Sequence, residues 1–133
     1  MKLILTSLFL LLATSAFAMS EQETIAMVIS AEAGGEGEKG LYAVACTISN
    51  RARAYHKTPY QVVTQKNQFY GLTTKNRMKL YKSVKTYADY LAKNIMQLRD
   101  ITGGALYFRR PDEPMFRWCK TETFRFNNHI FYR

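Results

Sequence analysis

The sequence predicts an α+β domain that is mostly α-helical and ends in a small β-hairpin. Apolar residues recur at spacings of three and four through much of residues 21–98, as in amphipathic helices. Glycines and prolines interrupt this pattern over residues 101–114. The tail then alternates in polarity on both sides of Asn127-Asn128, which favours a hairpin.

Residues 21–33 are predicted to form the first helix. Its apolar residues share one face with an acidic residue near the helix end: Ile25, Val28, Ile29 and Glu32. Gly34 and Gly35 then suit a C-terminal cap and a turn. A second helix is expected over residues 38–53, because its apolar residues again recur at helical spacing.

The later elements have weaker local signals. Thr58-Pro59 is typical of a cap followed by proline at the first helical position, which predicts a short helix through YQVV and a loop after it. A longer helix is expected from Asn76 to about Leu98. Residues 101–114 are expected to form a short aromatic run and a turn before the terminal hairpin.

Residues 1–18, MKLILTSLFLLLATSAFA, have the layout of a secretory signal peptide. Lys2 precedes an apolar run, and Ala16-Phe17-Ala18 has the small-x-small pattern of a cleavage site. The alternative is an uncleaved membrane anchor, for which the run is short against a hydrocarbon core of about 30 Å. We therefore expect a mature domain of residues 19–133 that is secreted or periplasmic and has no stable membrane insertion.

The mature chain is expected to be a single basic domain. It contains no internal repeat or linker, and its length suits one modest core in a monomer. The formal charge of the whole sequence is +9, which favours polyanionic partners such as cell-wall polymers, anionic membranes or nucleic acid. Nucleic acid is not expected, because aromatic residues do not interleave with Arg as in single-strand-binding proteins.

Cys46 and Cys119 allow one disulfide in an oxidising compartment. The alternative is two buried thiols, and the sequence does not supply the geometry that decides between them. Neither residue resembles a catalytic cysteine, because no His lies near either in the sequence.

Glu32 is the candidate catalytic residue. A carboxyl group removed from water keeps its proton more readily, because burial disfavours the charged form. Such an acid can donate a proton to a leaving-group oxygen, and the glycines after Glu32 would leave room for a substrate. The alternative is that Glu32 caps or salt-bridges the helix end and faces solvent.

Five short elements, in the same order, resemble the spore-cortex-lytic type of cell wall hydrolase. EAGGEGEKGLYAVACTISNRARA is similar to the family pattern Glu-Ala-x-Gly-Glu, then Gly-x-x-Ala-Val-Ala, then Asn-Arg. TPYQVVTQKNQF, ITGGALYFRRP and HIFYR are similar to its later elements, so the resemblance spans nearly all of residues 26–133. One departure is Gly34, where the family usually has Arg.

The resemblance implies a lysozyme-like single domain that acts on peptidoglycan glycan strands, with Glu32 as the catalytic residue. It implies a lytic transglycosylase that cleaves the β-1,4 bond between N-acetylmuramic acid and N-acetylglucosamine. One acid can then serve twice. It protonates the glycosidic oxygen, and it accepts the proton of the C6 hydroxyl as that oxygen attacks C1, which leaves a 1,6-anhydro ring and consumes no water.

A hydrolytic muramidase is the first alternative. Hydrolysis usually needs a second carboxylate, roughly 5 Å away for retention or 6.5 to 9.5 Å for inversion. Glu36 is the nearest candidate in the sequence. Its other possible role is to tie the turn to a neighbouring helix or loop through hydrogen bonds.

Six further residues are candidates for substrate binding. Amides suit sugar hydroxyl and acetamido groups, and an aromatic ring can pack on a sugar face. For each residue the alternative is a structural role, as a solvated amide, a core aromatic or a buried His that holds the fold. The candidates are Gln65, Gln68, Phe69, Tyr107, His129 and Tyr132.

No metal or cofactor is expected. A zinc amidase needs about three protein ligands, whereas this sequence has only His56 and His129 and no His-Glu-x-x-His segment. The competing class is a non-enzymatic secreted protein that binds wall polymer or inhibits a wall enzyme. Its support is the basic charge and small size.

Overall fold

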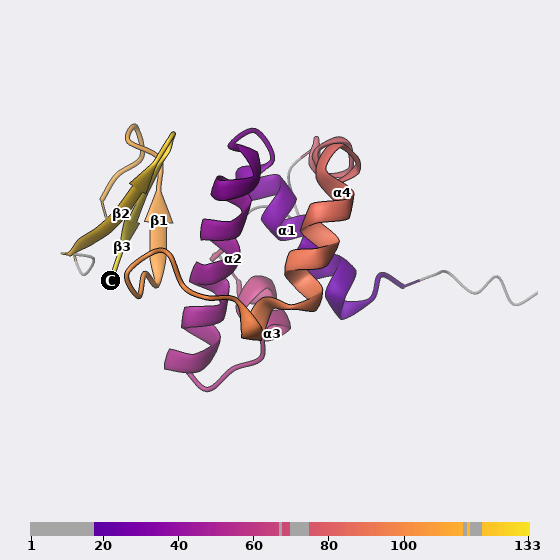
Figure 1. The fold of residues 1–133 in the computed structure, drawn as a ribbon, viewed down its shortest axis with the longest axis horizontal. Helices are drawn as coiled ribbons and strands as arrows, with labels where there is room; N and C mark the ends of the chain where they lie inside the picture. Colours follow the sequence, from indigo (N-terminus) through magenta and orange to yellow (C-terminus); the bar gives the residue numbers. More distant parts are fainter. Residues whose placement is uncertain (1–17, 67, 70–74, 116, 118–120) are drawn as a thin grey trace, which may run out of the picture.

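The computed structural model describes residues 18–66, 68–69, 75–115, 117 and 121–133, and it shows helices packed beside a small antiparallel sheet (Figure 1). The predicted mostly α-helical α+β fold is confirmed. The signal peptide falls on residues that, apart from Ala18, lie outside this description, so its cleavage stays a prediction. In chain order the elements are α1 Glu21–Ala33, α2 Gly37–Ala54, α3 Pro59–Thr64, α4 Arg77–Lys93, the 3-10 helix η1 Ile95–Gln97, and the strands β1 Tyr107–Arg109, β2 Glu122–Phe126 and β3 His129–Tyr132.

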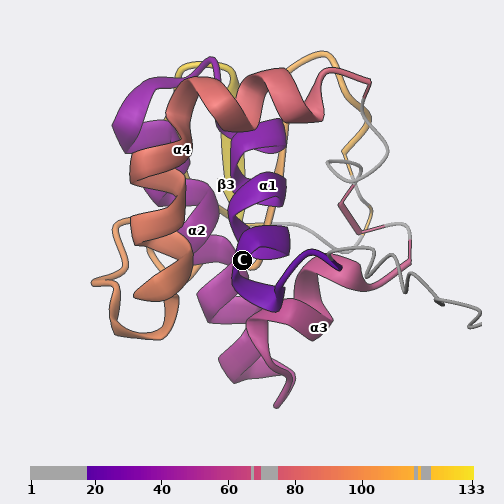
Figure 2. The same cartoon turned by 90° about the vertical axis from the view of Figure 1, so that its right-hand side faces the viewer.

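Helix α1 is the central helix of the domain. Ser20 caps it, since the Ser20 side chain accepts a hydrogen bond from the Glu23 N–H at 3.1 Å. α1 packs against α2, α3 and α4; in Figure 1 it lies between α2 and α4, and Figure 2 shows α3 below its first turns. For this reason it is buried around most of its circumference, Met27 and Ser30 included, rather than along the single stripe that its periodicity indicates.

Helices α2 and α3 follow the sequence signals closely. α2 spans one residue more at each end than the predicted 38–53. At α3, the Thr58 side chain accepts from the Gln61 N–H at 3.1 Å and the Gln61 side chain accepts from the Thr58 N–H at 2.9 Å. This reciprocal capping box fixes the helix start that Pro59 predicts.

Helix α4 is shorter and less regular than the predicted helix ending near Leu98. Val84 has non-helical torsions (φ −125°, ψ 17°), which kinks the helix, and the Ser83 hydroxyl donates to the Leu80 carbonyl at 2.7 Å beside this kink. The helix ends at Asn94, whose side chain donates to the Tyr90 carbonyl at 2.9 Å. The residues up to Gln97 form η1 instead.

The three strands form an antiparallel sheet in the order β1-β3-β2. Asn127 and Asn128 form the predicted two-residue turn between β2 and β3, and Asn127 adopts the left-handed conformation that such turns require (φ 47°). Strand alternation gives the sheet two faces. Phe108 and Phe131 pack on the helical core, whereas Ile130 and Tyr132 face away from it.

Cys46 carries a free, buried thiol on α2. Its Sγ donates to the Arg99 carbonyl at 3.6 Å, and burial raises the pKa of the thiol to about 11. The bridge that the two cysteines allow is therefore not formed at Cys46, and Cys119 lies outside the described residues. Within the described part of the chain, no helix combines the length and the apolar character needed to cross a membrane.

Candidate active site

Glu32 is half-buried in the last turn of α1 and lines a cleft of about 360 Å³. The cleft lies where three parts of the chain meet: the end of α1, the start of α4, and the sheet with the segment that follows β1. Its described lining residues are Ala31, Glu32, Asn76, Leu80, Phe108, Arg110, Glu113 and His129. Glu32 thus borders a hollow bounded by protein, as the catalytic hypothesis requires.

Gly34 allows α4 to approach the end of α1 closely. A Cβ atom at this position would lie 2.5 Å from the Ser30 carbonyl oxygen and 3.1 Å from Cδ2 of Leu80. Leu80 is itself a wall of the cleft. Glycine in place of Arg therefore fits this packing, because a side chain here would require the end of α1 to shift and the Leu80 side chain to give way.

Glu36 has the structural role that was one of its two alternatives. It is 7% exposed, and its carboxylate accepts a hydrogen bond from the Asn128 N–H at 3.3 Å. Its carbonyl accepts from the Asn127 side chain at 3.1 Å, so Glu36 ties the start of α2 to the hairpin turn. A Cβ at Gly40 would lie 2.3 Å from the Glu36 Cβ, so this glycine makes room for the Glu36 side chain. Glu36 is not among the described lining residues of the Glu32 cleft.

His129 is the one candidate binding residue that the structure brings into the cleft with Glu32. It is 2% exposed and its ring packs on Phe108 at 5.0 Å between centroids. Its Nδ1 has no hydrogen-bond partner among the described residues. Burial lowers the pKa of His129, although Glu36 and Glu113 oppose that effect. His129 is therefore a neutral hydrogen-bonding group at neutral pH.

Three other candidates form a cluster that supports the fold. Arg51 is buried, donates to the Gln68 side chain, and places its guanidinium 5.1 Å from the Phe69 ring centre and 4.9 Å from that of Tyr107. The Asn50 side chain donates to the Ala105 carbonyl at 3.0 Å. This cluster joins α2 to the segment after α3 and to β1, so Gln68, Phe69 and Tyr107 do not line the Glu32 cleft.

The remaining two candidates also lie elsewhere. Gln65 is exposed and accepts a hydrogen bond from Lys57 Nζ at 3.3 Å. Tyr132 belongs to the sheet face that points away from the helical core, and its hydroxyl accepts from Arg109 Nε at 2.8 Å. Neither residue lines the Glu32 cleft.

Two charged residues and one aromatic residue of the cleft were not predicted from the sequence. Phe108 follows the candidate Tyr107, and adjacent strand residues point to opposite faces, but only the fold decides which one points inward. Arg110 and Glu113 lie in a segment that its prolines marked merely as a turn. The Glu113 carboxylate accepts from the Arg110 N–H at 3.1 Å. The signal available was a cluster of charges directly after a short strand.

No group of three or more His, Cys, Asp or Glu residues suited to hold a metal occurs in the part of the chain that the structure describes. Among the described residues that line the cleft, the groups that can take part in chemistry are the carboxyl groups of Glu32 and Glu113, the imidazole of His129 and the guanidinium of Arg110.

The fold and the match to a family model together define the class, the enzymes that act on the bacterial cell wall. Residues 35–132 match the Cell Wall Hydrolase family, and the chain belongs to this family. The resemblance seen in the sequence is thus confirmed. The match contains the cleft residues from α4 and the sheet but begins three residues after Glu32.

Two solved structures have the same fold. The catalytic domain of the germination-specific lytic transglycosylase SleB from Bacillus anthracis matches with a TM-score of 0.69 and 22% identity, over 90% of this chain and 98% of that chain. The catalytic domain of the Bacillus cereus SleB protein matches with a TM-score of 0.64 and 24% identity, over 88% and 94%. No curated protein matches this chain.

Proposed function

We propose that the protein is a peptidoglycan lytic transglycosylase in which Glu32 is the catalytic acid. The observation that carries this proposal is the position of Glu32, which is half-buried at the end of the central helix and lines a cleft. Membership of the cell wall hydrolase family and the fold shared with a lytic transglycosylase catalytic domain support it. After removal of residues 1–18 the enzyme would act as a monomer outside the cytoplasm.

In the first step, the protonated Glu32 donates its proton to the glycosidic oxygen between the two sugars. The bond from C1 of the muramic residue to that oxygen breaks, and the N-acetylglucosamine part leaves with a hydroxyl group. The ring that remains develops positive charge at C1. The Glu32 carboxylate formed by this step stabilises that charge across the cleft.

In the second step, the C6 hydroxyl of the same muramic residue attacks C1, and Glu32 accepts its proton. A bond from O6 to C1 forms, so the product carries a 1,6-anhydro ring and the acid is regenerated. His129 and Asn76 supply a neutral imidazole and an amide for sugar hydroxyl or acetamido groups. The Phe108 ring supplies an apolar surface for a sugar face.

A specific observation favours hydrolysis as the second candidate function. Glu113 lines the same cleft as Glu32 and would supply the second carboxylate that hydrolysis usually requires. Glu36, the candidate from the sequence, is instead engaged by the hairpin turn. In our proposal Glu113 stays part of the cleft wall, held by the Arg110 backbone.

The test is the release of muropeptides from purified peptidoglycan, followed by turbidity and identified by mass spectrometry. We expect anhydro-muropeptides from the wild type, none from Glu32→Gln, and no effect of EDTA. Reducing-end products without the anhydro ring would contradict transglycosylation and favour hydrolysis with Glu113. Loss of activity with EDTA would point to a metal, and binding without any release would favour the non-enzymatic class.

A further inference from the structure

The segment after β1, residues 110–113, is held in place by one side chain, and we call it the wall segment. The Nη1 of Arg109 donates to three carbonyl oxygens, those of Arg110 at 3.1 Å, Pro111 at 3.2 Å and Glu113 at 3.0 Å. Arg109 is fixed in turn by Tyr132, whose hydroxyl accepts from Nε and whose ring centre lies 5.5 Å from the guanidinium. The backbone of the wall segment is therefore preorganised.

Unlike the side chain of Arg109, the side chain of Arg110 does not bind the wall segment. This side chain is exposed, and no ion pair or hydrogen bond to its guanidinium occurs among the described residues, although Asp112 and Glu113 are close in sequence. The Glu113 carboxylate is bound by the Arg110 backbone N–H, not by the Arg110 side chain. The wall segment thus presents a guanidinium that its own acidic residues leave available.

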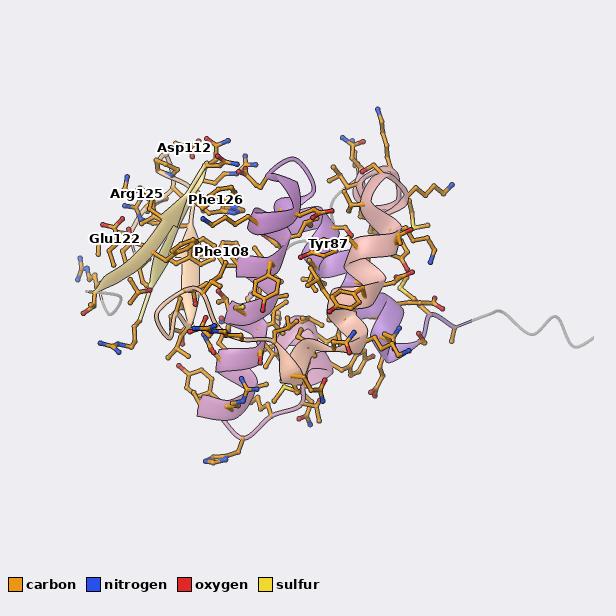
Figure 3. All side chains as sticks on the ribbon, viewed as in Figure 1. Tyr87, Phe108, Asp112, Glu122, Arg125 and Phe126 are labelled. Atoms are coloured by element: carbon orange, nitrogen blue, oxygen red, sulfur yellow. The ribbon has the colours of Figure 1, made fainter. Side chains whose placement is uncertain are left out.

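Arg110 lies at the junction of two hollows. One is the Glu32 cleft, and the other is a hollow of about 390 Å³ whose described lining is Arg110, Pro111, Asp112 and Asn128. Asn128 precedes His129, which lines the first hollow, so the two adjoin. Figure 3 shows Asp112 at the end of the sheet, beyond the strands. A glycan bound at Glu32 therefore has room for a side branch that passes Arg110.

The side branch of a muramic residue is acidic. Its lactyl ether ends in a carboxyl group that is either free or joined to a stem peptide, and the stem peptide carries free carboxylates. A guanidinium binds a carboxylate through two parallel hydrogen bonds and stays charged at any physiological pH. The ligand group that suits the Arg110 guanidinium is thus a carboxylate on the lactyl-peptide branch.

We propose that Arg110 is a specificity residue that binds a carboxylate of the lactyl-peptide branch on the muramic residue whose bond Glu32 breaks. This inference rests on the proposed function, because it takes the substrate of the Glu32 cleft to be peptidoglycan. It also explains why Arg109 fixes the wall segment: the free guanidinium is offered from a backbone that does not have to be ordered when the substrate binds.

The experiment measures the binding of soluble glycan strands to the Glu32→Gln protein, which does not consume them, with and without Arg110→Gln. Strands with their natural carboxylates should bind about tenfold more weakly to the double variant, the loss expected for one charge-assisted interaction. Strands whose carboxylates have been converted to neutral amides should show a penalty of less than about twofold. The dependence on substrate charge is a result that a merely structural role of Arg110 would not give.

Arg125→Gln is the matched control, because it removes the same charge from an arginine outside the cleft. Arg125 pairs with Glu122 at 2.7 Å, and Figure 3 shows both on the outer side of the sheet. This variant should change binding by less than about twofold on every preparation. An equal penalty for Arg125→Gln and Arg110→Gln would reduce the effect to net charge and overturn the proposal.

A third preparation identifies the carboxylate. Strands stripped of peptides by an amidase carry a free lactyl carboxylate, which is amide-linked in intact strands. A penalty confined to intact strands therefore assigns the stem peptide, a penalty confined to stripped strands assigns the lactyl group, and a penalty on both shows that Arg110 binds either carboxylate. Equal penalties on all three preparations, or none, overturn the proposal. If binding depends on Arg110 and on carboxylates but the wild type releases no muropeptide, the inference stands and the proposed activity fails. If no preparation binds, both fail.

Discussion

The helical part and the sheet contribute to the cleft in different ways. α1 places Glu32 in the last turn of a helix that Ser20 caps at its start and that the surrounding helices bury. The sheet contributes Phe108, His129 and the wall segment through pairings between residues far apart in the sequence. The position of the acid thus depends on one buried helix, whereas the surface facing the substrate depends on strand register and on Arg109.

Glu32→Asp should have the largest effect of the variants below. Shortening the acid by one methylene draws the carboxyl group back from the cleft, and a displacement on the order of 1 Å costs about 10²-fold in rate. Glu113→Gln leaves the α1 acid in place and should cost less than about tenfold, below the usual range of general acid–base catalysis. The measurement is the rate of turbidity loss on peptidoglycan, with circular dichroism as the control for folding. A larger loss for Glu113→Gln than for Glu32→Asp would mean that Glu113, in the segment after β1, is the principal catalytic acid.

Gly40→Ala should weaken the contact between the start of α2 and the hairpin turn of the sheet. The new Cβ would lie 2.3 Å from the Glu36 Cβ and would displace the side chain that holds the hairpin turn. We expect a loss of about 1–3 kcal/mol of stability, although Gly to Ala inside a helix normally stabilises a protein. Gly35→Ala is the matched control, because nothing lies within 4 Å of its Cβ position. The measurement is urea unfolding, and a stabilising Gly40→Ala would contradict the role of Glu36.

His129 should make stability fall at acidic pH. Burial lowers its pKa in the folded protein, with Arg110 acting in the same direction and Glu36 and Glu113 opposing. The unfolded chain then binds the proton more readily, so this contribution is complete above about pH 6.5 and is lost as the pH falls towards the folded pKa. Unfolding midpoints between about pH 5 and 7.5 should show a flatter dependence for His129→Gln. An unchanged slope would contradict the buried, neutral imidazole, and His56→Gln, at an exposed position, serves as the control.

Tyr132→Phe should have the smallest effect. It removes only the hydroxyl that accepts from Arg109, and one such hydrogen bond contributes about 1 kcal/mol. Tyr55→Phe removes a hydroxyl that is bonded to Tyr107 at the surface and should cost less. Unfolding midpoints compare the two variants. Equal losses would mean that the Tyr132 hydroxyl contributes nothing specific to the position of Arg109.

Much of the helical part could be predicted because its signals are local. The cap at Thr58, the proline after it and the periodicity of α1 gave helix boundaries close to those observed. The kink at Val84 was not predicted, since it depends on how α4 packs. Among the site residues, Glu32 and His129 do lie in one cleft.

The rest of the cleft depends on information that one sequence does not contain. The sequence does not show which of Tyr107 and Phe108 lies on the cleft side of β1. The pairing of β1 with β3, more than twenty residues later, decides this. Glu36 was the only second acid that the sequence suggested, and only the fold shows that the hairpin turn engages Glu36 while Glu113 lines the cleft.

The most direct test of the central claim, that one acid breaks the glycan without water, is the reaction of the wild type in H₂¹⁸O. The account predicts that every new muramic end is an anhydro ring without ¹⁸O, as read by mass spectrometry of the released muropeptides. New reducing ends that carry ¹⁸O, absent from a control without enzyme, would contradict it.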